Sequence, residues 1–201
     1  MPPTVRPGRS PCSPFAAARP SVQTDGVVGA VPERVQRAVA LLDLRGDAAV
    51  LEIGPGPGAA VELVLARHPG VRYVALDRSA TAVARTTARN RTAVDDGRLV
   101  VRQGDVTDPD LADTLGGPFD VVFAVNVNVF WTRTAHLEAS ALAALLVTDG
   151  ALWLVYETPG GDDDRVLDAV RASLAVPELG EQVVVRDDVL AVGARRTLAG
   201  G

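Results

Sequence analysis

The stretch that decides the fold is Ala48-Ala-Val-Leu-Glu-Ile-Gly-Pro-Gly-Pro-Gly58. Its first six residues form a short, mostly apolar run that suits a buried parallel strand, and the residues from Ala59 to His68 suit a helix. The three glycines between these segments can adopt the backbone angles of a tight turn and let a ligand approach the start of the helix. This order of strand, glycine turn and helix predicts the beginning of an α/β domain with a ligand site at the turn.

The rest of the chain alternates helix-like and strand-like segments, which is typical of a mainly parallel sheet covered on both faces. A leading helix is expected from Pro32 to about Leu44. Further strands are expected at 72–77, 98–103, 119–125, 151–156, 182–186 and 189–194, and further helices at 79–90, 136–147 and 166–176. Only Asp187 and Asp188 separate the last two strands, which must therefore pair as an antiparallel hairpin. The sequence predicts a Rossmann-like, seven-stranded α/β sheet, mostly parallel, with helices on both faces.

Composition excludes several kinds of chemistry. The chain has 201 residues and a net charge of -5, and all 20 of its Lys+Arg residues are arginines, which rules out a P-loop lysine and a Schiff-base lysine. Cys12 is the single cysteine and His68 and His136 are the two histidines, so we expect no disulfide within the chain and no metal site. The acidic balance gives no overall attraction to nucleic acid, and none is expected as a partner.

The first 26 residues are rich in proline and arginine and poor in large apolar groups, so they cannot build a core. We expect 1–26 to be a disordered tail or a lid over a substrate, and 27–201 to be one domain. No apolar run approaches the roughly 18 residues of a spanning helix. The expected location is therefore the cytoplasm, with no membrane span, and the sequence does not determine an oligomeric state.

Acidic residues stand at the ends of the first three predicted strands. Glu52 lies just before the glycine turn, Asp77 ends the second strand, and Asp105 follows the third. These strand ends share the carboxyl edge of the sheet, where ligands of such folds bind. A carboxylate at Asp77 can accept hydrogen bonds from both hydroxyls of a ribose. Each position also has a purely structural interpretation, because Asp77 can serve the following helix as an N-terminal charge and Asp105 can be a solvated loop acid.

The glycine turn alone leaves two cofactors open. Gly54, Gly56 and Ala59 also satisfy the dinucleotide pattern G-x-G-x-x-G/A. The negative charge of Glu52 favours a ligand that carries an ammonium and a sulfonium over one that carries two phosphates.

The run from Glu52 to Gly58 resembles the first motif of the class I methyltransferases that use S-adenosylmethionine (SAM), in which an acid and one further residue precede G-x-G-x-G. The resemblance implies that Gly54, Gly56 and Gly58 pack against the amino acid part of SAM. It also implies that Glu52 helps to order this loop and the ammonium group of SAM.

Two further segments extend this resemblance. Asp77, with Arg78 after it, is expected to bind the ribose of the cofactor, and because nicotinamide enzymes share this acid it indicates an adenosine ribose and not a particular cofactor. Gly104, Asp105 and Val106 are similar to the family's next element, which implies that Asp105 takes the adenine amino group and that the following backbone amide binds a ring nitrogen.

Residues 119–131, Phe-Asp-Val-Val-Phe-Ala-Val-Asn-Val-Asn-Val-Phe-Trp, resemble the fourth motif of small-molecule methyltransferases similar to those of quinone biosynthesis. The resemblance implies that Asn126 lies beside the transferring methyl group and contacts SAM. Val127 and Asn128 replace the two prolines of the [D/N/S]-P-P-[Y/F/W] motif of DNA amino-methyltransferases, which argues against methylation of an amino group on a base. Asn126 can alternatively cap a strand end, and Trp131 can simply fill the core.

The predicted function is transfer of a methyl group from SAM to a small-molecule acceptor by in-line displacement. Asn126 and His136 are the candidate catalytic residues, the second as a general base, although a histidine in a first helical turn can equally be a surface group. Tyr156 and Glu157 can line the acceptor pocket. Two alternatives remain: a non-catalytic protein that binds SAM or a partner, and a nicotinamide-dependent oxidoreductase.

Overall fold

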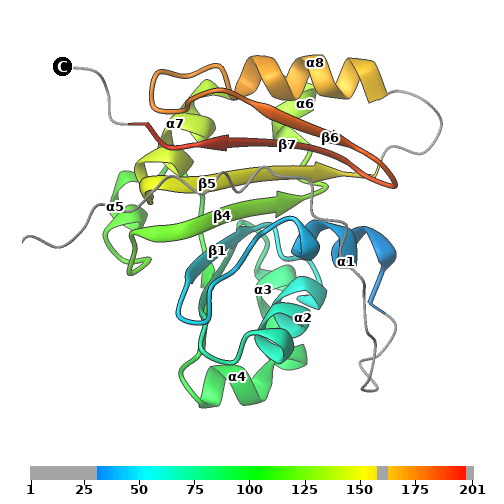
Figure 1. The fold of residues 1–201 in the computed structure, drawn as a ribbon. Helices are drawn as coiled ribbons and strands as arrows, with labels where there is room; N and C mark the ends of the chain where they lie inside the picture. Colours follow the sequence, from blue (N-terminus) through cyan, green and yellow to red (C-terminus); the bar gives the residue numbers. More distant parts are fainter. Residues whose placement is uncertain (1–30, 158–162, 198–201) are drawn as a thin grey trace, which may run out of the picture.

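Seven strands form one sheet in the order β3-β2-β1-β4-β5-β7-β6. The computed structural model describes residues 31–157 and 163–197, so the predicted tail at 1–26 lies outside the described residues. The strands are β1 (Ala49–Ile53), β2 (Arg72–Asp77), β3 (Leu99–Gln103), β4 (Phe119–Val125), β5 (Leu146–Tyr156), β6 (Val183–Arg186) and β7 (Leu190–Arg195). Strands β1, β4, β5, β7 and β6 follow one another from the bottom to the top of the sheet in Figure 1.

Strands β1 to β5 pair in parallel, and β7 pairs antiparallel with both β5 and β6. The predicted class of fold is therefore confirmed, including the antiparallel hairpin at the end. The first parallel strands bring their carboxyl ends to one edge, where β1 and β4 lie next to each other although they are far apart in sequence. This edge is the switch point at which ligands of open α/β sheets bind.

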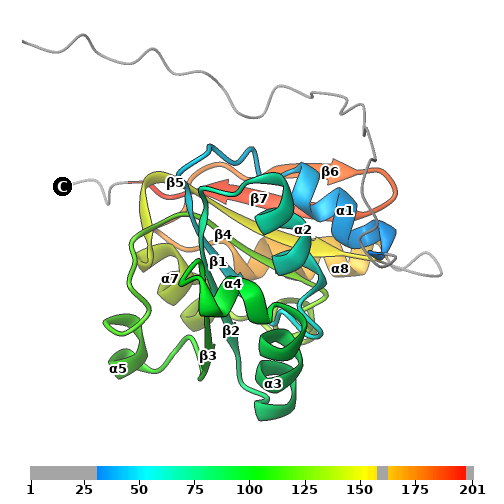
Figure 2. The ribbon, with the colours of Figure 1, turned by 90° about the horizontal axis from the view of Figure 1, so that it is seen from below.

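The helices are α1 (Glu33–Ala40), α2 (Ala59–Arg67), α3 (Ala80–Arg89), α4 (Arg91–Asp95), α5 (Pro109–Ala112), α6 (Val129–Thr132), α7 (His136–Ala144) and α8 (Asp163–Ser173). They cover both faces of the sheet, and Figure 2 shows α2 and α4 in front of the strands and α7 and α8 behind them. Ser79 caps α3 as expected, because its side chain accepts a hydrogen bond from the backbone amide of Ala82 at 3.3 Å.

Each face of the sheet has its own apolar core. Successive residues of β1 point to opposite faces, so Leu51 packs with α6, α7 and α8, while Val50 packs with α1, α2 and α4. Both side chains are completely buried. The sheet is therefore held from both sides, which fixes the positions of its strand ends.

The boundary between α7 and β5 differs from the prediction. A helix was expected at 136–147 and a strand from 151, but α7 ends at Ala144 and β5 begins at Leu146. The pairing of β5 with β4 shifts in register between Leu146, which pairs with Phe119, and Ala151, which pairs with Val121. Asp149 lies within this irregular stretch and has φ +63°. A register shift of this kind preserves strand pairing across residues that otherwise signal a turn.

Candidate functional site

A cleft of about 260 Å³ opens at the carboxyl ends of β1, β2, β3 and β4. It contains seven of the predicted site residues, which are Gly54, Asp77, Arg78, Gly104, Asp105, Val106 and Asn126. These residues come from four separate loops, and the parallel pairing of the strands brings them together. Glu52, Gly56, Gly58 and His136 are not among the residues that line this cleft.

One wall of the cleft was missed by sequence analysis. Val127, Val129 and Phe130 come from the turn after β4 and from α6, and Glu138 comes from α7. Phe130 is almost fully buried, so it forms the base of this wall rather than its surface. Helix α6 has only four residues, too few to show a helical period in the sequence, so this wall becomes visible only in the folded chain.

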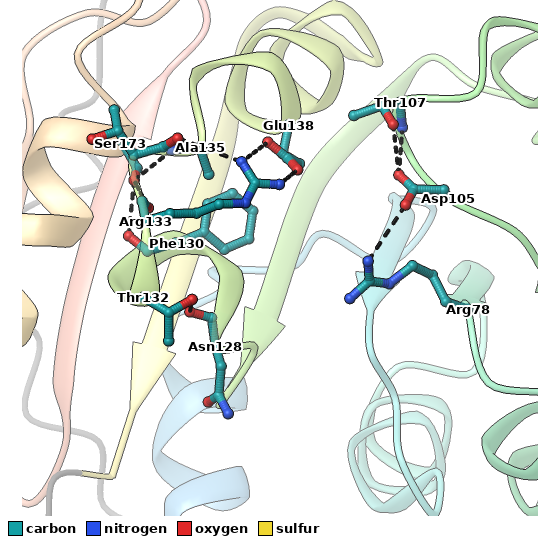
Figure 3. Close-up of polar contacts among 11 residues, drawn as sticks. Arg78, Asp105, Thr107, Asn128, Phe130, Thr132, Arg133, Ala135, Glu138 and Ser173 are labelled. Carbon is teal, nitrogen blue, oxygen red and sulfur yellow. Dashed lines mark hydrogen bonds and ion pairs between the residues drawn. The ribbon is translucent and has the colours of Figure 1, made fainter.

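Hydrogen bonds hold both of the predicted aspartates in place. Asp77 accepts a bond from the backbone amide of Ser79 at 2.8 Å. One oxygen of Asp105 accepts bonds from the backbone amide of Thr107 at 3.0 Å and from its hydroxyl at 2.8 Å, and the other lies 3.6 Å from the guanidinium of Arg78 (Figure 3). The bonds from Thr107 are the main reason why the pKa of Asp105 lies below its ordinary value. Asp105 is therefore ionised at neutral pH.

A second arginine pair lies across the cleft. Arg133, in the turn between α6 and α7, forms a two-pronged ion pair with the Glu138 carboxylate (Figure 3). The Glu138 side chain is only 12% exposed, so the pair lies at the wall and not out in solvent. Arg78, which lines the cleft, and Arg133, whose partner Glu138 lines it, are thus each paired with a carboxylate.

Two hydrogen bonds from α3 and its C-terminal end hold the glycine loop in place. The carbonyl of Gly56 accepts a bond from the Thr86 hydroxyl at 3.0 Å, and that of Gly58 accepts one from the Asn90 side chain at 3.1 Å. Gly54, Gly56 and Gly58 all have positive φ, a region that side chains rarely adopt. The loop therefore keeps a fixed shape before any ligand binds.

Glu52 lies beneath the loop. Its side chain is buried in the sheet, where it accepts a hydrogen bond of 2.7 Å from the hydroxyl of Tyr73 on β2. Burial raises the pKa of Glu52 from 4.5 to about 7, although the bond from Tyr73 works in the opposite direction. In this structure the carboxylate supports the strand that carries the glycine turn.

We expect the stability of the fold to fall as Glu52 ionises. Its folded-state pKa is raised, so its stabilising contribution is complete below pH 4.5 and disappears as the pH rises to about 7. A Glu52→Gln variant can accept the same bond from Tyr73 and has no charge to bury. Its free energy of unfolding in urea should therefore lack this pH dependence, a difference on the order of 3 kcal/mol between the two ends of the range.

A Tyr73→Phe variant provides the matched comparison. Loss of the hydroxyl removes the bond that lowers the pKa of Glu52, so the decline in stability should extend to higher pH. Identical pH profiles for wild type and Glu52→Gln would contradict this account of the buried carboxyl group.

Asn126 occupies the turn directly after β4. Its φ is +57°, and its backbone amide donates to the carbonyl of Val155 on β5 at 2.8 Å. The side-chain oxygen accepts a bond of 2.9 Å from the backbone amide of Glu157. Next to it, the Tyr156 hydroxyl donates to the carbonyl of Val127 at 3.0 Å. The end of β5 therefore fixes the turn that carries Asn126.

His136 lies at the start of α7 and packs toward α8. Its Nε2 lies 2.8 Å from the carbonyl oxygen of Ala172, so the ring joins the two helices. Trp131 packs partly against the core, and its ring lies 5.4 Å from the guanidinium carbon of Arg165. Among residues 31–157 and 163–197, no three His, Cys, Asp or Glu side chains are grouped as metal ligands.

The fold is that of the class I methyltransferases. Residues 51–152 match the family model described as a methyltransferase domain, and the chain belongs to that family. No helix within the described part of the chain has the length and apolar content to span a bilayer.

Solved structures with the same fold share little sequence with this chain. A predicted O-methyltransferase from Agrobacterium tumefaciens is 19% identical, with a TM-score of 0.61 over 81% of this chain and 80% of its own. An O-methyltransferase family protein from Burkholderia thailandensis is 17% identical, with a TM-score of 0.60 over 81% of this chain and 56% of its own. At such low identity these likenesses establish the fold.

A curated relative is closer in sequence over a shorter stretch. The probable ribosomal RNA small subunit methyltransferase A of Methanospirillum hungatei is 39% identical over 93 residues. The match covers 46% of this chain and 33% of the relative, so the chain corresponds to about a third of that protein's length.

Proposed function

We propose that the cleft at the ends of β1 to β4 binds SAM and that the methyl acceptor is a small molecule. The residues present fit the cofactor, because Asp77 places a carboxylate at the end of β2 and Asp105 places another at the end of β3. Gly54 fits as well, since a Cβ there would lie 2.7 Å from the side chain of Val127. When bound, SAM supplies a methyl carbon activated by the neighbouring sulfonium.

The roles of the chain's own residues follow from their places in the cleft. Asp77 would accept bonds from the ribose hydroxyls, and Asp105 would accept one from the adenine amino group. Leu76, Val106 and Val127 add apolar surface for the adenine ring. Asn126 would lie beside the acceptor. Positioning and exclusion of water are the main contributions that these groups make to an in-line displacement.

The single observation that carries the small-molecule proposal is the charge of the cleft lining, in which the carboxylates of Asp77, Asp105 and Glu138 outnumber the guanidinium of Arg78. Arg78 lies against Asp105 and Arg133 against Glu138, and Asp77 adds a further negative charge to the lining. RNA binding depends on cationic side chains that neutralise phosphates, and the lining of this cleft has more carboxylates than guanidinium groups. An acidic, partly apolar cleft suits a small acceptor without phosphate groups.

Transfer of tritium from methyl-labelled SAM tests the proposal. The purified protein is incubated with cell extract separated into a low-molecular-weight filtrate, an RNA fraction and a protein fraction. We expect label in the filtrate. Label in the RNA fraction would instead support an acceptor like that named for the Methanospirillum relative. SAM binding without transfer to any fraction would favour a non-catalytic SAM-binding protein.

A further inference from the structure

The side-chain amide of Asn126 has a fixed orientation. The group that faces it from β5 is the backbone amide of Glu157, 2.9 Å from the Asn126 oxygen. A backbone N–H can only donate, so the oxygen of the side chain must face Glu157 and the Nδ2 group must be at the other end. No acceptor within residues 31–157 and 163–197 is hydrogen bonded to Nδ2. Because Asn126 lines the cleft, its N–H groups are available to a ligand there.

Two hydrogen-bond acceptors at the same turn already receive a bond. The Asn126 oxygen takes the bond from Glu157, and the carbonyl of Val127 takes the bond from the Tyr156 hydroxyl at 3.0 Å. The turn therefore offers N–H donors to a ligand. The Asn126 oxygen and the Val127 carbonyl already accept bonds from Glu157 and Tyr156 at the end of β5.

From this arrangement we infer that the atom methylated is an oxygen, as in a hydroxyl, phenol or enol acceptor, and that Asn126 selects it by donating a hydrogen bond. The inference rests on the proposed function. An oxygen nucleophile has a second lone pair that can accept the bond from Nδ2 while the first reacts. An amine has one lone pair, which the reaction uses, so an amine nitrogen cannot accept the bond from Nδ2 while it reacts.

The bond from Asn126 would also hold the acceptor in its reactive form. A neutral amide donor stabilises an ionised oxygen more than a protonated one, because charge-assisted hydrogen bonds are stronger. In the transfer, the acceptor oxygen supplies the electron pair of the new C–O bond, the pair of the broken C–S bond stays on sulfur, and the hydroxyl proton passes to water. Because water takes the proton, the transfer requires no general base from the chain.

Two probes of nearly equal shape test the inference. The protein is saturated with S-adenosylhomocysteine and titrated at alkaline pH with 4-nitrophenolate or 4-nitroaniline, whose binding is followed by absorbance. We expect the wild-type protein to bind 4-nitrophenolate about tenfold more tightly, the effect of one charge-assisted hydrogen bond. Methyl label recovered in the low-molecular-weight filtrate should in addition be released as methyl iodide by hydriodic acid, a reaction of methyl groups on oxygen.

Two substitutions suit the positive φ of Asn126. Asn126→Asp keeps an oxygen for Glu157 and turns the second oxygen toward the cleft, so the preference should change to 4-nitroaniline. Asn126→Gly removes the amide without adding charge, so the preference should disappear. Equal binding of the two probes to the wild type, binding of neither, or a preference that survives in Asn126→Gly would overturn the inference.

Failure of the proposed function gives a different result. If S-adenosylhomocysteine does not bind to the wild-type protein, the cofactor site has been assigned wrongly and the inference falls with it. If it binds and the filtrate is labelled, but the label resists hydriodic acid, the function stands and oxygen as the acceptor atom is excluded.

Discussion

An Asp77→Asn variant is expected to bind SAM about 100-fold more weakly than the wild type. The substitution keeps one oxygen to accept the bond from the amide of Ser79, so the turn before α3 should retain its shape. The second oxygen becomes an amino group and can no longer accept a bond from a ribose hydroxyl. Loss of charged hydrogen bonds worth about 1.5 to 3 kcal/mol each accounts for an effect of this size.

Calorimetric titration with SAM measures the change. The matched control is Asp95→Asn, which removes a carboxylate from the exposed end of α4, where it pairs only with Arg91. The control should bind SAM as the wild type does and unfold at nearly the same urea concentration, because exposed pairs contribute little to stability. Unchanged affinity in Asp77→Asn would show that the ribose is bound elsewhere.

Alanine substitutions at Gly46, which precedes β1, and at Gly56 and Gly58 in the glycine loop should produce a graded loss of stability. Gly46 has no positive φ and open space around its Cβ position, so Gly46→Ala should leave the free energy of unfolding almost unchanged. Gly56 has φ +55° and equally open space, so Gly56→Ala should cost about 1 to 2 kcal/mol from backbone strain alone.

Gly58→Ala should combine backbone strain from the positive φ with a steric clash of the new methyl group. Its φ is +76°, and a Cβ would lie 2.6 Å from the Asn90 side chain and 3.1 Å from the Cα of Thr86, which belongs to a helix and cannot move easily. We expect a loss of about 3 to 4 kcal/mol, combining the strain with the 1 to 3 kcal/mol typical of overpacking. Urea unfolding of the three variants gives the series, and equal losses at Gly56 and Gly58 would mean that α3 yields to the extra methyl group.

Most of the fold was predictable because its signals are local. The strands from β1 to β3 end in or just before a glycine or an acid, and β4 ends just before Asn126. Only three residues separate β6 from β7, which allows only a hairpin. The prediction failed at the boundary between α7 and β5, where the sequence is compatible with either a helix or a strand. The apolar residues around Leu145 suit both a helix and a strand, and the pairing of Leu146 with Phe119 on β4 decides for the strand.

The site likewise has residues that the sequence predicts and residues that only the folded chain reveals. Gly54, Asp77 and Asp105 end strands in the sequence, so their convergence on one edge follows from parallel pairing. Glu138 reaches the cleft only because α7 packs on the face of the sheet that also carries α6 and α8. The spacing of residues around Glu138 in the sequence does not indicate that this side chain lines the cleft. The ionic partner of Arg133 and the bond between Asn126 and Glu157 depend likewise on distances that only the folded chain defines.

The position of β7 has a consequence for synthesis on the ribosome. β7 follows β6 along the chain but lies between β5 and β6 in the sheet. Until Arg195 has left the exit tunnel, a nascent chain presents the open edge of β5, whose residues from Gly150 to Tyr156 are all buried in the finished domain. Unpaired strand edges attract other unfolded chains. The interval between the emergence of β5 and that of β7 is therefore when this domain most needs protection from aggregation.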